Sequence, residues 1–392
     1  MDDGEQHIRI SKGLLPLSWL YGLAVRARNL LFDIGILKSK NYDVPMISVG
    51  NITVGGTGKT PHVEYLIRLL KDRLNVAVLS RGYKRKSRGF VLADKGSTAA
   101  DIGDEPYQIK NKYAGITVAV DKNRRRAMDI LTDDNVMKDI DVVILDDAFQ
   151  HRYVKPGINI LLVDYHRQIM HDKLLPAGRL REPLSGKSRA DVVIVTKCPD
   201  DLKPMDYRVI TKAMDLYPYQ SLFFTTLEYG MMYLLFAGGE QKALADLKGM
   251  NVLLLTGIAS PWQMRSRVEA CAERVVALSF SDHHTFKKKD VRKINAAFTD
   301  MPAPKIIVTT EKDAARLKSV EGLDDDARAA LFVLPVSVRF MLGQGERFDE
   351  KIIGYVQKNS RNSILAKAKD DDKSANSHHT GNRPRTISFR DN

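Results

Sequence analysis

The chain has 392 residues, of which 44% are hydrophobic and 28% charged, as in an ordinary globular protein with room for two domains. Its two cysteines, Cys198 and Cys271, lie far apart, which excludes a disulfide framework and a cysteine-rich zinc site and favours a reducing compartment. The formal net charge of +13 calls for an acidic partner, which could be nucleic acid, anionic lipid or a phosphorylated substrate.

The N-terminal segment, 1–44, is expected to contain an amphipathic helix. Its first 13 residues are polar and no apolar run of roughly 18 residues occurs anywhere, so we expect neither a signal peptide nor a membrane span. One helical face, with Trp19 at its edge, carries Leu20, Leu23, Ala24, Ala27, Leu30, Leu31 and Ile34. Such a face can lie at a membrane interface or pack on its own domain, and the periodicity alone favours packing.

Residues 47–61 predict a phosphate-binding loop. An apolar strand at 47–49 leads into Gly55-Gly56-Thr57-Gly58-Lys59-Thr60, and a helical pattern follows. Backbone N–H groups of such a loop wrap around phosphate, the lysine reaches the β- and γ-phosphates, and the Thr60 hydroxyl can hold Mg²⁺. The full pattern asks for glycine at position 53, where this chain has Thr53. A nucleoside triphosphate is the expected ligand.

A second metal ligand is predicted at the end of a buried strand. The aliphatic run 142–145 ends in Asp146-Asp147, as in a parallel strand whose carboxyl end opens on a ligand crevice. We assign Asp146 to Mg²⁺.

Beyond the loop, strand-like and helical runs alternate, which predicts an α/β fold: a P-loop NTPase-like doubly wound parallel sheet with a second, smaller α/β domain. The expected strands are 76–80, 116–120, 142–146, 158–164 and 192–196, then 252–256, 275–280, 306–310 and 331–335. We place the P-loop domain at 45–220, a linker at 221–250 and the smaller domain at 251–358. Residues 359–392 are polar and aperiodic, and we expect them to be disordered.

Several loops at strand ends are rich in functional groups. Each is typical of a solvated loop when taken alone, but their joint occurrence on one scaffold favours a site. They are 80–85, 103–106, 121–124, 149–152, 175–183 and 282–284.

Over residues 14–355 the chain resembles the tetraacyldisaccharide 4'-kinases, which phosphorylate the lipid A precursor of Gram-negative bacteria. The resemblance rests on eight blocks in order: Gly50-Asn51 with 55–61, Ser80-Arg81-Gly82-Tyr83, Gly103-Asp104-Glu105-Pro106, 145–152, 178–183, Thr256-Gly257-Ile258-Ala259, Asp282-His283-His284 and Thr310-Glu311-Lys312-Asp313-Ala314. The family commonly has glycine where this chain has Ala148.

The resemblance implies transfer of the γ-phosphoryl group of ATP to the 4'-hydroxyl of an acylated glucosamine disaccharide 1-phosphate. Lys59 would hold the phosphates, with Thr60 and Asp146 on Mg²⁺. By similarity Asp104 is the general base, and His283 from the second domain orients it. His284 points elsewhere and is expected to be structural.

The resemblance also places further residues near the nucleotide or the sugar. Arg81, Arg181 and Arg124 suit phosphate oxygens, although the sequence does not divide them between ATP and the substrate 1-phosphate. The remaining positions are Glu105, Asp147, Gln150, His151 and Glu182.

A lipid acceptor shifts the interpretation of the N-terminal helix towards a membrane interface. We then expect a monomer attached peripherally to the cytoplasmic face of the bacterial inner membrane, with no nucleic acid partner. Two alternatives stay open. A membrane-associated P-loop regulatory ATPase would transfer phosphate only to water, and a nucleic-acid translocase would need a concentrated basic or aromatic face.

Overall fold

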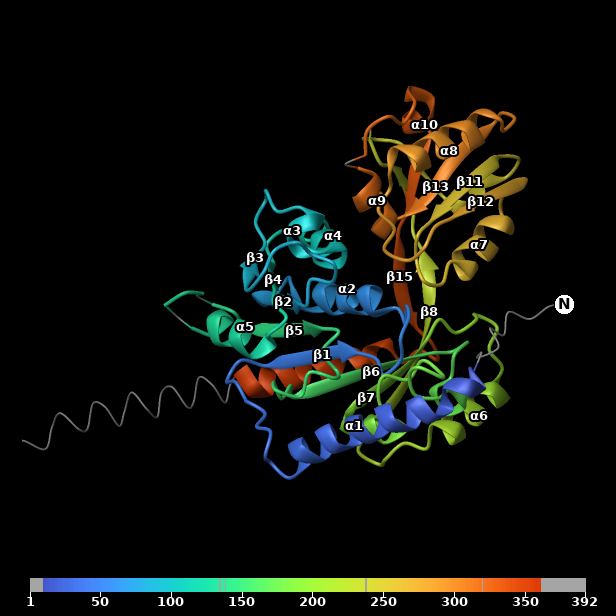
Figure 1. The fold of residues 1–392 in the computed structure, drawn as a ribbon. Coiled ribbons are helices and arrows are strands. Elements are labelled where there is room, and N and C mark those ends of the chain that lie inside the picture. Colours follow the sequence, from blue (N-terminus) through green and yellow to red (C-terminus); the bar gives the residue numbers. More distant parts are fainter. Residues whose placement is uncertain (1–9, 134, 138, 237, 319, 361–392) are drawn as a thin grey trace, which may run out of the picture.

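The computed structural model describes residues 10–360 except 134, 138, 237 and 319, and shows a larger and a smaller α/β unit (Figure 1). The larger unit holds the helices α1 (Leu15–Asp33), α2 (Lys59–Leu70), α3 (Ala99–Ile102), α4 (Asp104–Lys112), α5 (Arg124–Leu131), α6 (Pro204–Met214) and 345–360. The smaller unit holds α7 (Trp262–Glu269), α8 (Lys288–Thr299), α9 (Glu311–Leu317) and α10 (Asp325–Ala329). Short 3₁₀ helices occur at Lys12–Leu14, Ile169–His171, Leu184–Arg189 and Leu244–Leu247.

The larger unit is built on a nine-stranded sheet in the order β15-β8-β7-β6-β1-β5-β2-β4-β3. Neighbouring strands are parallel except at the two edges, where β3 and β15 run antiparallel to their partners. The strands are β1 (Met46–Gly50), β2 (Val76–Ser80), β3 (Val91–Leu92), β4 (Thr117–Val120), β5 (Val142–Asp146), β6 (Ile158–Asp164), β7 (Val192–Thr196), β8 (Ser221–Tyr229) and β15 (Val336–Phe340). The doubly wound parallel sheet predicted from the sequence is therefore confirmed.

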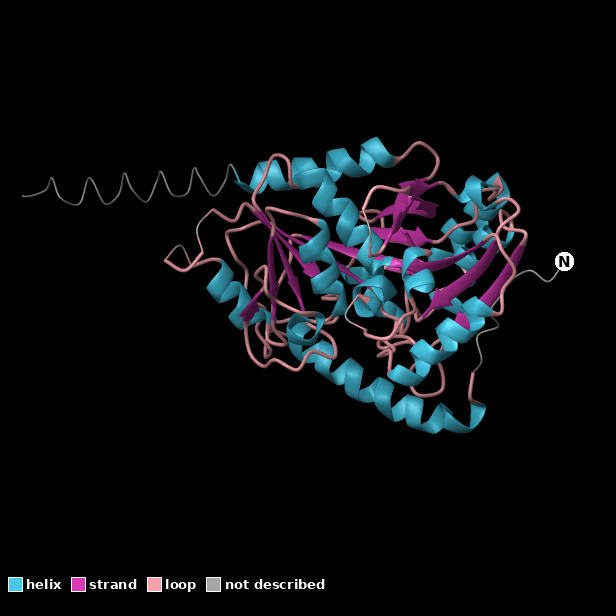
Figure 2. Ribbon diagram, turned by 90° about the horizontal axis from the view of Figure 1, so that it is seen from above, coloured by secondary structure: helices cyan, strands magenta, loops and turns pink. Residues whose placement is uncertain are grey.

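Helices cover both faces of this sheet (Figure 2). Alternate residues of the central strands point to opposite faces, both of which are covered, so a strand such as β5 is buried throughout and apolar up to its last residue, Asp146. One face packs on α2, α4 and the helix 345–360, and the other on α5 and α6. With β1 and β5 adjacent, the loops after them meet at one edge of the sheet.

The smaller unit has a six-stranded sheet in the order β10-β9-β14-β13-β11-β12. Its four strands β11 to β14 are parallel, and β9 and β10 continue the sheet antiparallel. The bounds are β9 (Met232–Leu234), β10 (Gln241–Lys242), β11 (Asn251–Thr256), β12 (Arg274–Ser279), β13 (Lys305–Thr310) and β14 (Leu331–Leu334).

The chain crosses between the units at two places, which the sequence-based boundaries did not anticipate. The expected linker 221–250 supplies β8 to the larger sheet and β9 and β10 to the smaller one. The expected smaller domain 251–358 ends earlier, because β15 pairs with β8 and the helix 345–360 joins the core of the larger unit. Aromatic packing explains why the chain returns to the larger unit after β14. Phe340 stacks on Phe348 at 4.4 Å, and both contact Phe223 of β8.

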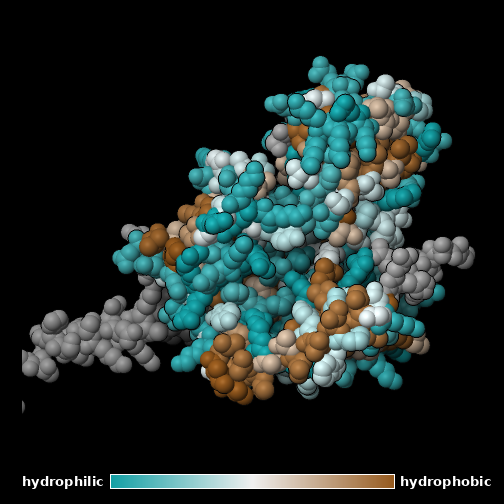
Figure 3. Space-filling model, in the orientation of Figure 1, coloured by the Kyte–Doolittle hydropathy of each residue, from teal (hydrophilic) through white to brown (hydrophobic). Residues whose placement is uncertain are grey.

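The N-terminal helix α1 lies along the larger unit with its apolar face outward. It packs through Ser18, Gly22 and Phe32, which are buried, while the leucines of its apolar face are exposed. Brown atoms gather over α1 along the lower edge of Figure 3. The leucine face is therefore exposed, as the membrane-interface interpretation requires, and it does not pack on the larger unit, as the periodicity alone had favoured.

Of the expected tail 359–392, the structure describes 359 and 360, which belong to the last helix, and the rest lies outside the described residues. None of the helices within the described ranges has the length and hydropathy needed to span a bilayer.

Candidate active site

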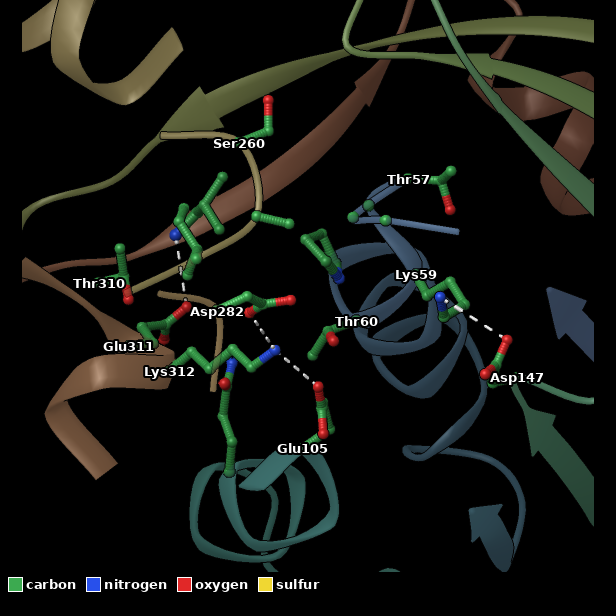
Figure 4. A pocket seen from close by; sticks show the side chains of 18 of the residues that line it. Thr57, Lys59, Thr60, Glu105, Asp147, Ser260, Asp282, Thr310, Glu311 and Lys312 are labelled. Atoms are coloured by element: carbon green, nitrogen blue, oxygen red, sulfur yellow. Dashed lines mark hydrogen bonds and ion pairs between the residues drawn. The ribbon is translucent and has the colours of Figure 1, made fainter. Parts of the chain in front are cut away.

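A cleft of about 450 Å³ opens where the two units face each other. The larger unit lines it with the phosphate-binding loop 53–60, Arg81, Glu105 and the ends of β2 and β5. The smaller unit lines it with the loop 258–260, the loop 282–283 and the start of α9 (Figure 4). Residues from four of the strand-end blocks, 80–85, 103–106, 175–183 and 282–284, thus meet in one place.

The phosphate-binding loop has the backbone conformation that its glycines predict. Gly55 and Gly58 have φ values of +119° and +81°, which side chains other than glycine rarely adopt. Asn51 Nδ2 donates to Thr57 Oγ1 at 2.7 Å, which fixes the loop to the end of β1. Gly58 precedes α2, so the positive end of this helix and its first residue, Lys59, face the loop interior.

Two adjacent carboxylates follow β5 and differ in charge environment. Asp146 accepts a hydrogen bond from Ser80 Oγ at 2.9 Å, and burial together with Asp147 and Glu105 raises its pKa to about 6. A buried carboxylate surrounded by other carboxylates is stabilised by a cation. Thr60 and Asp146, the pair predicted to hold a cation, both line this cleft.

Asp147 instead pairs with cations of the protein. Its Oδ1 lies 3.6 Å from Lys59 Nζ and 3.3 Å from Arg181 Nη2 (Figure 4 shows the first pair). Burial favours the neutral form, but these two cations outweigh it and lower the pKa of Asp147. Lys59 and Arg181 therefore both lie at the cleft, with the carboxylate of Asp147 between them. Phosphate oxygens could contact the same two cations.

Three of the predicted contact residues lie behind the cleft. Gln150, His151 and Glu182 are not among the described residues that line it. Glu182 is buried and accepts hydrogen bonds from Gln150 Nε2 at 3.2 Å and Arg189 Nη2 at 2.7 Å. These side chains support the loops that carry Arg181 rather than facing the cavity.

Arg124, a further phosphate candidate, also supports the site from behind. It is buried and donates to the backbone oxygens of Asp121 and Asp146, at 2.7 and 2.9 Å. Arg81, in contrast, lines the cleft.

Asp104 and His283 meet across the two units although 179 residues separate them. Asp104 begins α4, and its Oδ2 lies 2.9 Å from His283 Nδ1. His283 has a φ of +56°, an unusual value for a residue with a side chain, so its loop is held in a strained turn. The neighbouring His284 turns away, as expected, and pairs with Asp290 at 2.9 Å.

Two cations of α9 complete this group, and sequence reasoning missed both. Lys312 Nζ lies 2.8 Å from Glu105 Oε1 (Figure 4). It also lies 3.2 Å from His283 Nε2, so the ring proton is assigned to Nδ1. Arg316 Nη2 lies 2.7 Å from Asp104 Oδ2. The block 310–314 after a strand was the available signal, but its charged residues carried no expected role.

The pKa of Asp104 reflects these neighbours. Burial alone would raise it, but hydrogen bonds from His283 and Arg316 outweigh burial and lower the pKa to about 2. The carboxylate is consequently ionised at neutral pH and can accept a proton.

Comparison with known proteins identifies relatives along nearly the whole chain. A family model described as tetraacyldisaccharide-1-P 4'-kinase matches residues 10–357. A tetraacyldisaccharide 4'-kinase from Phocaeicola vulgatus is 54% identical over 91% of this chain and 98% of its own length, and one from Bacteroides thetaiotaomicron is 49% identical over 92% and 97%. A crystal structure described as the "apo" form of LpxK from Aquifex aeolicus in complex with ATP has a TM-score of 0.66 at 29% identity, covering 88% of this chain and 98% of that chain.

Proposed function

This chain belongs to the tetraacyldisaccharide-1-P 4'-kinase family and is a kinase of lipid A biosynthesis, and we propose that the groups gathered in the cleft perform the transfer. The phosphoryl donor is ATP, and the acceptor is the 4'-hydroxyl of a tetraacyldisaccharide 1-phosphate. The observation that carries the proposal is the contact between Asp104 and His283 opposite the phosphate-binding loop.

The residues present fit a nucleotide triphosphate with Mg²⁺. The loop 55–58 offers backbone N–H groups, and Lys59 and Arg181 offer positive charge, so they would bind the phosphate oxygens. Thr60 and Asp146 would hold Mg²⁺, which when bound neutralises charge developing on the phosphate oxygens.

Asp104 acts as the general base in this proposal. A sugar hydroxyl loses its proton as the new P–O bond forms, so the base must be ionised and correctly directed at neutral pH. The low pKa of Asp104 meets the first condition and limits its strength as a base. The transition state of phosphoryl transfer is loose, and the acceptor hydroxyl has lost little of its proton when that state is reached. A weak but well-placed base therefore suffices.

The outward apolar face of α1 supports peripheral attachment to the cytoplasmic face of the inner membrane. Its exposed side chains include Leu20, Leu23 and Leu30 at 56%, 53% and 56%. Its opposite side reaches the site, because Tyr21 Oη donates to Arg181 O at 2.7 Å and Arg28 Nη2 to Gln150 O at 3.2 Å. A helix on the bilayer would therefore hold the site close to a lipid head group.

The test is a transfer assay with γ-labelled ATP, Mg²⁺ and the acylated disaccharide 1-phosphate in detergent. Wild-type protein should put label into lipid, and Asp104→Asn should lower the rate by about 10²-fold or more, as for loss of a general base. The matched control is Asp72→Asn, an exposed carboxylate on the larger unit. Labelled phosphate released to water with no labelled lipid would contradict the proposal.

A further inference from the structure

Two sequence blocks, 256–259 and 310–314, have no role in the reaction so far. Both follow strands of the smaller unit, β11 and β13, and a fully buried carboxylate, Asp313, joins them. Asp313 Oδ2 accepts a hydrogen bond from Thr310 Oγ1 at 2.7 Å and from the backbone N–H of Gly257 at 2.8 Å. A Cβ at position 257 would lie only 2.8 Å from Asp313 Oδ1, so glycine is required there.

Asp313 in turn holds Arg316 in a fixed place. Arg316 Nη1 lies 3.1 Å from Asp313 Oδ1, one turn earlier in α9, and 3.4 Å from Gly257 O. The Arg316 side chain is 8% exposed. Its other edge crosses to the larger unit, where Nε and Nη2 lie 3.1 and 2.7 Å from Asp104 Oδ2. One planar guanidinium thus links carboxylates of both units.

The three donors to Asp104 converge on one oxygen. His283 Nδ1 lies 2.9 Å from the same Oδ2 that Arg316 contacts twice. A carboxylate held through one oxygen has a defined plane and direction, which a single hydrogen bond would not give it. The two residues that supply these donors come from separate segments of the smaller unit, His283 from the loop 282–283 and Arg316 from α9.

We propose that Arg316 is a positioning residue for the transfer: Asp313 and Gly257 fix it, and together with His283 it orients Asp104 through Oδ2 so that Oδ1 faces the acceptor hydroxyl. This inference rests on the proposed role of Asp104 as the base. It assigns the blocks 256–259 and 310–314 a shared role, which is to hold the Arg316 side chain in place.

The same contacts make the orientation depend on the approach of the two units. The loop after Gly257 reaches the phosphate-binding loop, since a Cβ at Gly56 would lie 3.3 Å from Ala259 Cβ. The smaller unit therefore contacts the nucleotide loop through Ala259 and the base through Arg316. Asp104 is directed correctly only when the smaller unit sits over the nucleotide loop.

A double-mutant cycle of Arg316→Ala and Asp104→Asn tests the inference, with kcat and both KM values measured in the transfer assay. Arg316→Ala should lower kcat about 10- to 100-fold, the effect of misplacing a reacting group by about 1 Å. Because Arg316 acts through Asp104, its loss in the Asp104→Asn background should cost less than about threefold. Arg316→Lys, which keeps the charge but not the fork, should fall between.

The control is Arg265→Ala, which removes an exposed arginine paired with Glu269 in the same unit and should leave kcat unchanged. Circular dichroism verifies folding, and if Arg316→Ala does not fold, the cycle is run with Arg316→Lys. An equal loss in both backgrounds, or a kcat of the single variant within about twofold of wild type, would overturn the inference. Full activity of Asp104→Asn would instead overturn the base assignment beneath it.

Discussion

Replacing Lys112 with methionine should destabilise the fold by breaking an ion-pair bridge between the units. Lys112 ends α4, and its Nζ lies 2.7 Å from Glu64 Oε2 in α2 and 2.6 Å from Glu311 Oε1 in α9. The two carboxylate side chains are only 1% and 7% exposed. Methionine keeps most of the apolar length of the side chain and removes its charge, so the variant isolates the electrostatic loss.

The expected loss is about 2–3 kcal/mol in the free energy of unfolding. Removing one partner of a buried pair costs about 3–5 kcal/mol, and water partly screens Lys112, which is 29% exposed. Glu64 keeps hydrogen bonds from Gln108 Nε2 at 2.8 Å and Tyr113 Oη at 3.2 Å. Most of the cost therefore falls on Glu311.

The loss should depend on pH. Burial raises the pKa of Glu311, Glu64 raises it further, and Lys112 opposes both. Without Lys112 the folded pKa lies still further above the unfolded value, so folding takes up a proton in acid. The destabilisation is then complete above the folded pKa of Glu311 and shrinks as pH falls through it.

Urea unfolding followed by circular dichroism at pH 8 and pH 5 measures both effects. Glu311→Gln in the Lys112→Met background should recover most of the stability, and the control Lys71→Met, in an exposed pair, should change little. The reasoning fails if Lys112→Met stays within about 0.5 kcal/mol of wild type at pH 8. It also fails if the loss is the same at both pH values and Glu311→Gln restores nothing.

Three further predictions concern stability and membrane binding. Burial lowers the pKa of His62 to about 4, so below pH 6.5 the unfolded chain binds a proton that the folded chain excludes. The free energy of unfolding should therefore fall by up to about 3 kcal/mol between pH 6.5 and 4, and the same fall in His62→Gln would refute this. Gly82→Ala should lose more stability than Gly115→Ala, for which we expect about 1 kcal/mol, because both have positive φ but only the Cβ at 82 meets neighbouring atoms; equal melting temperatures would contradict this. Leu20→Ser combined with Leu23→Ser should weaken flotation with anionic vesicles about 10-fold or more while activity on detergent-dispersed lipid persists, and undiminished flotation would exclude α1 as the contact.

Elements set by local pattern were predictable from the sequence. The bounds of β2, β5, β6 and β7 match the expected ranges, because strands buried on both faces read as continuous apolar runs between polar loops. The location of Lys59, Thr60 and Asp146 at the cleft was predictable for a similar reason, since a phosphate-binding loop and the acid ending the adjacent strand are short motifs.

Features set by distant pairing were not predictable in this way. The strand β15 alternates apolar and polar residues, but nothing in its five residues indicates that it joins the larger sheet. Its partner β8 and the stacking of Phe340 on Phe348 decide that. Arg316 lies 212 residues from Asp104, and its contact depends on how α9 meets α4. The close approach of Ser18 and Gly22 to the larger unit was not predictable either, because the apolar periodicity of α1 marks only its exposed leucine face.

The smaller unit is inserted between β8 and β15, and this has a consequence for synthesis on the ribosome. The strands of the smaller sheet lie in one continuous stretch from β9 to β14, so this unit can fold as soon as that stretch has emerged. The core around α2, by contrast, includes Phe348, Ile352 and Val356. The nucleotide loop is among the first parts to be translated, yet its supporting core must wait for these residues. A chain released after truncation just before residue 348 should therefore hold a folded smaller unit beside an incomplete nucleotide-binding unit, which exposes apolar surface that chaperones can bind.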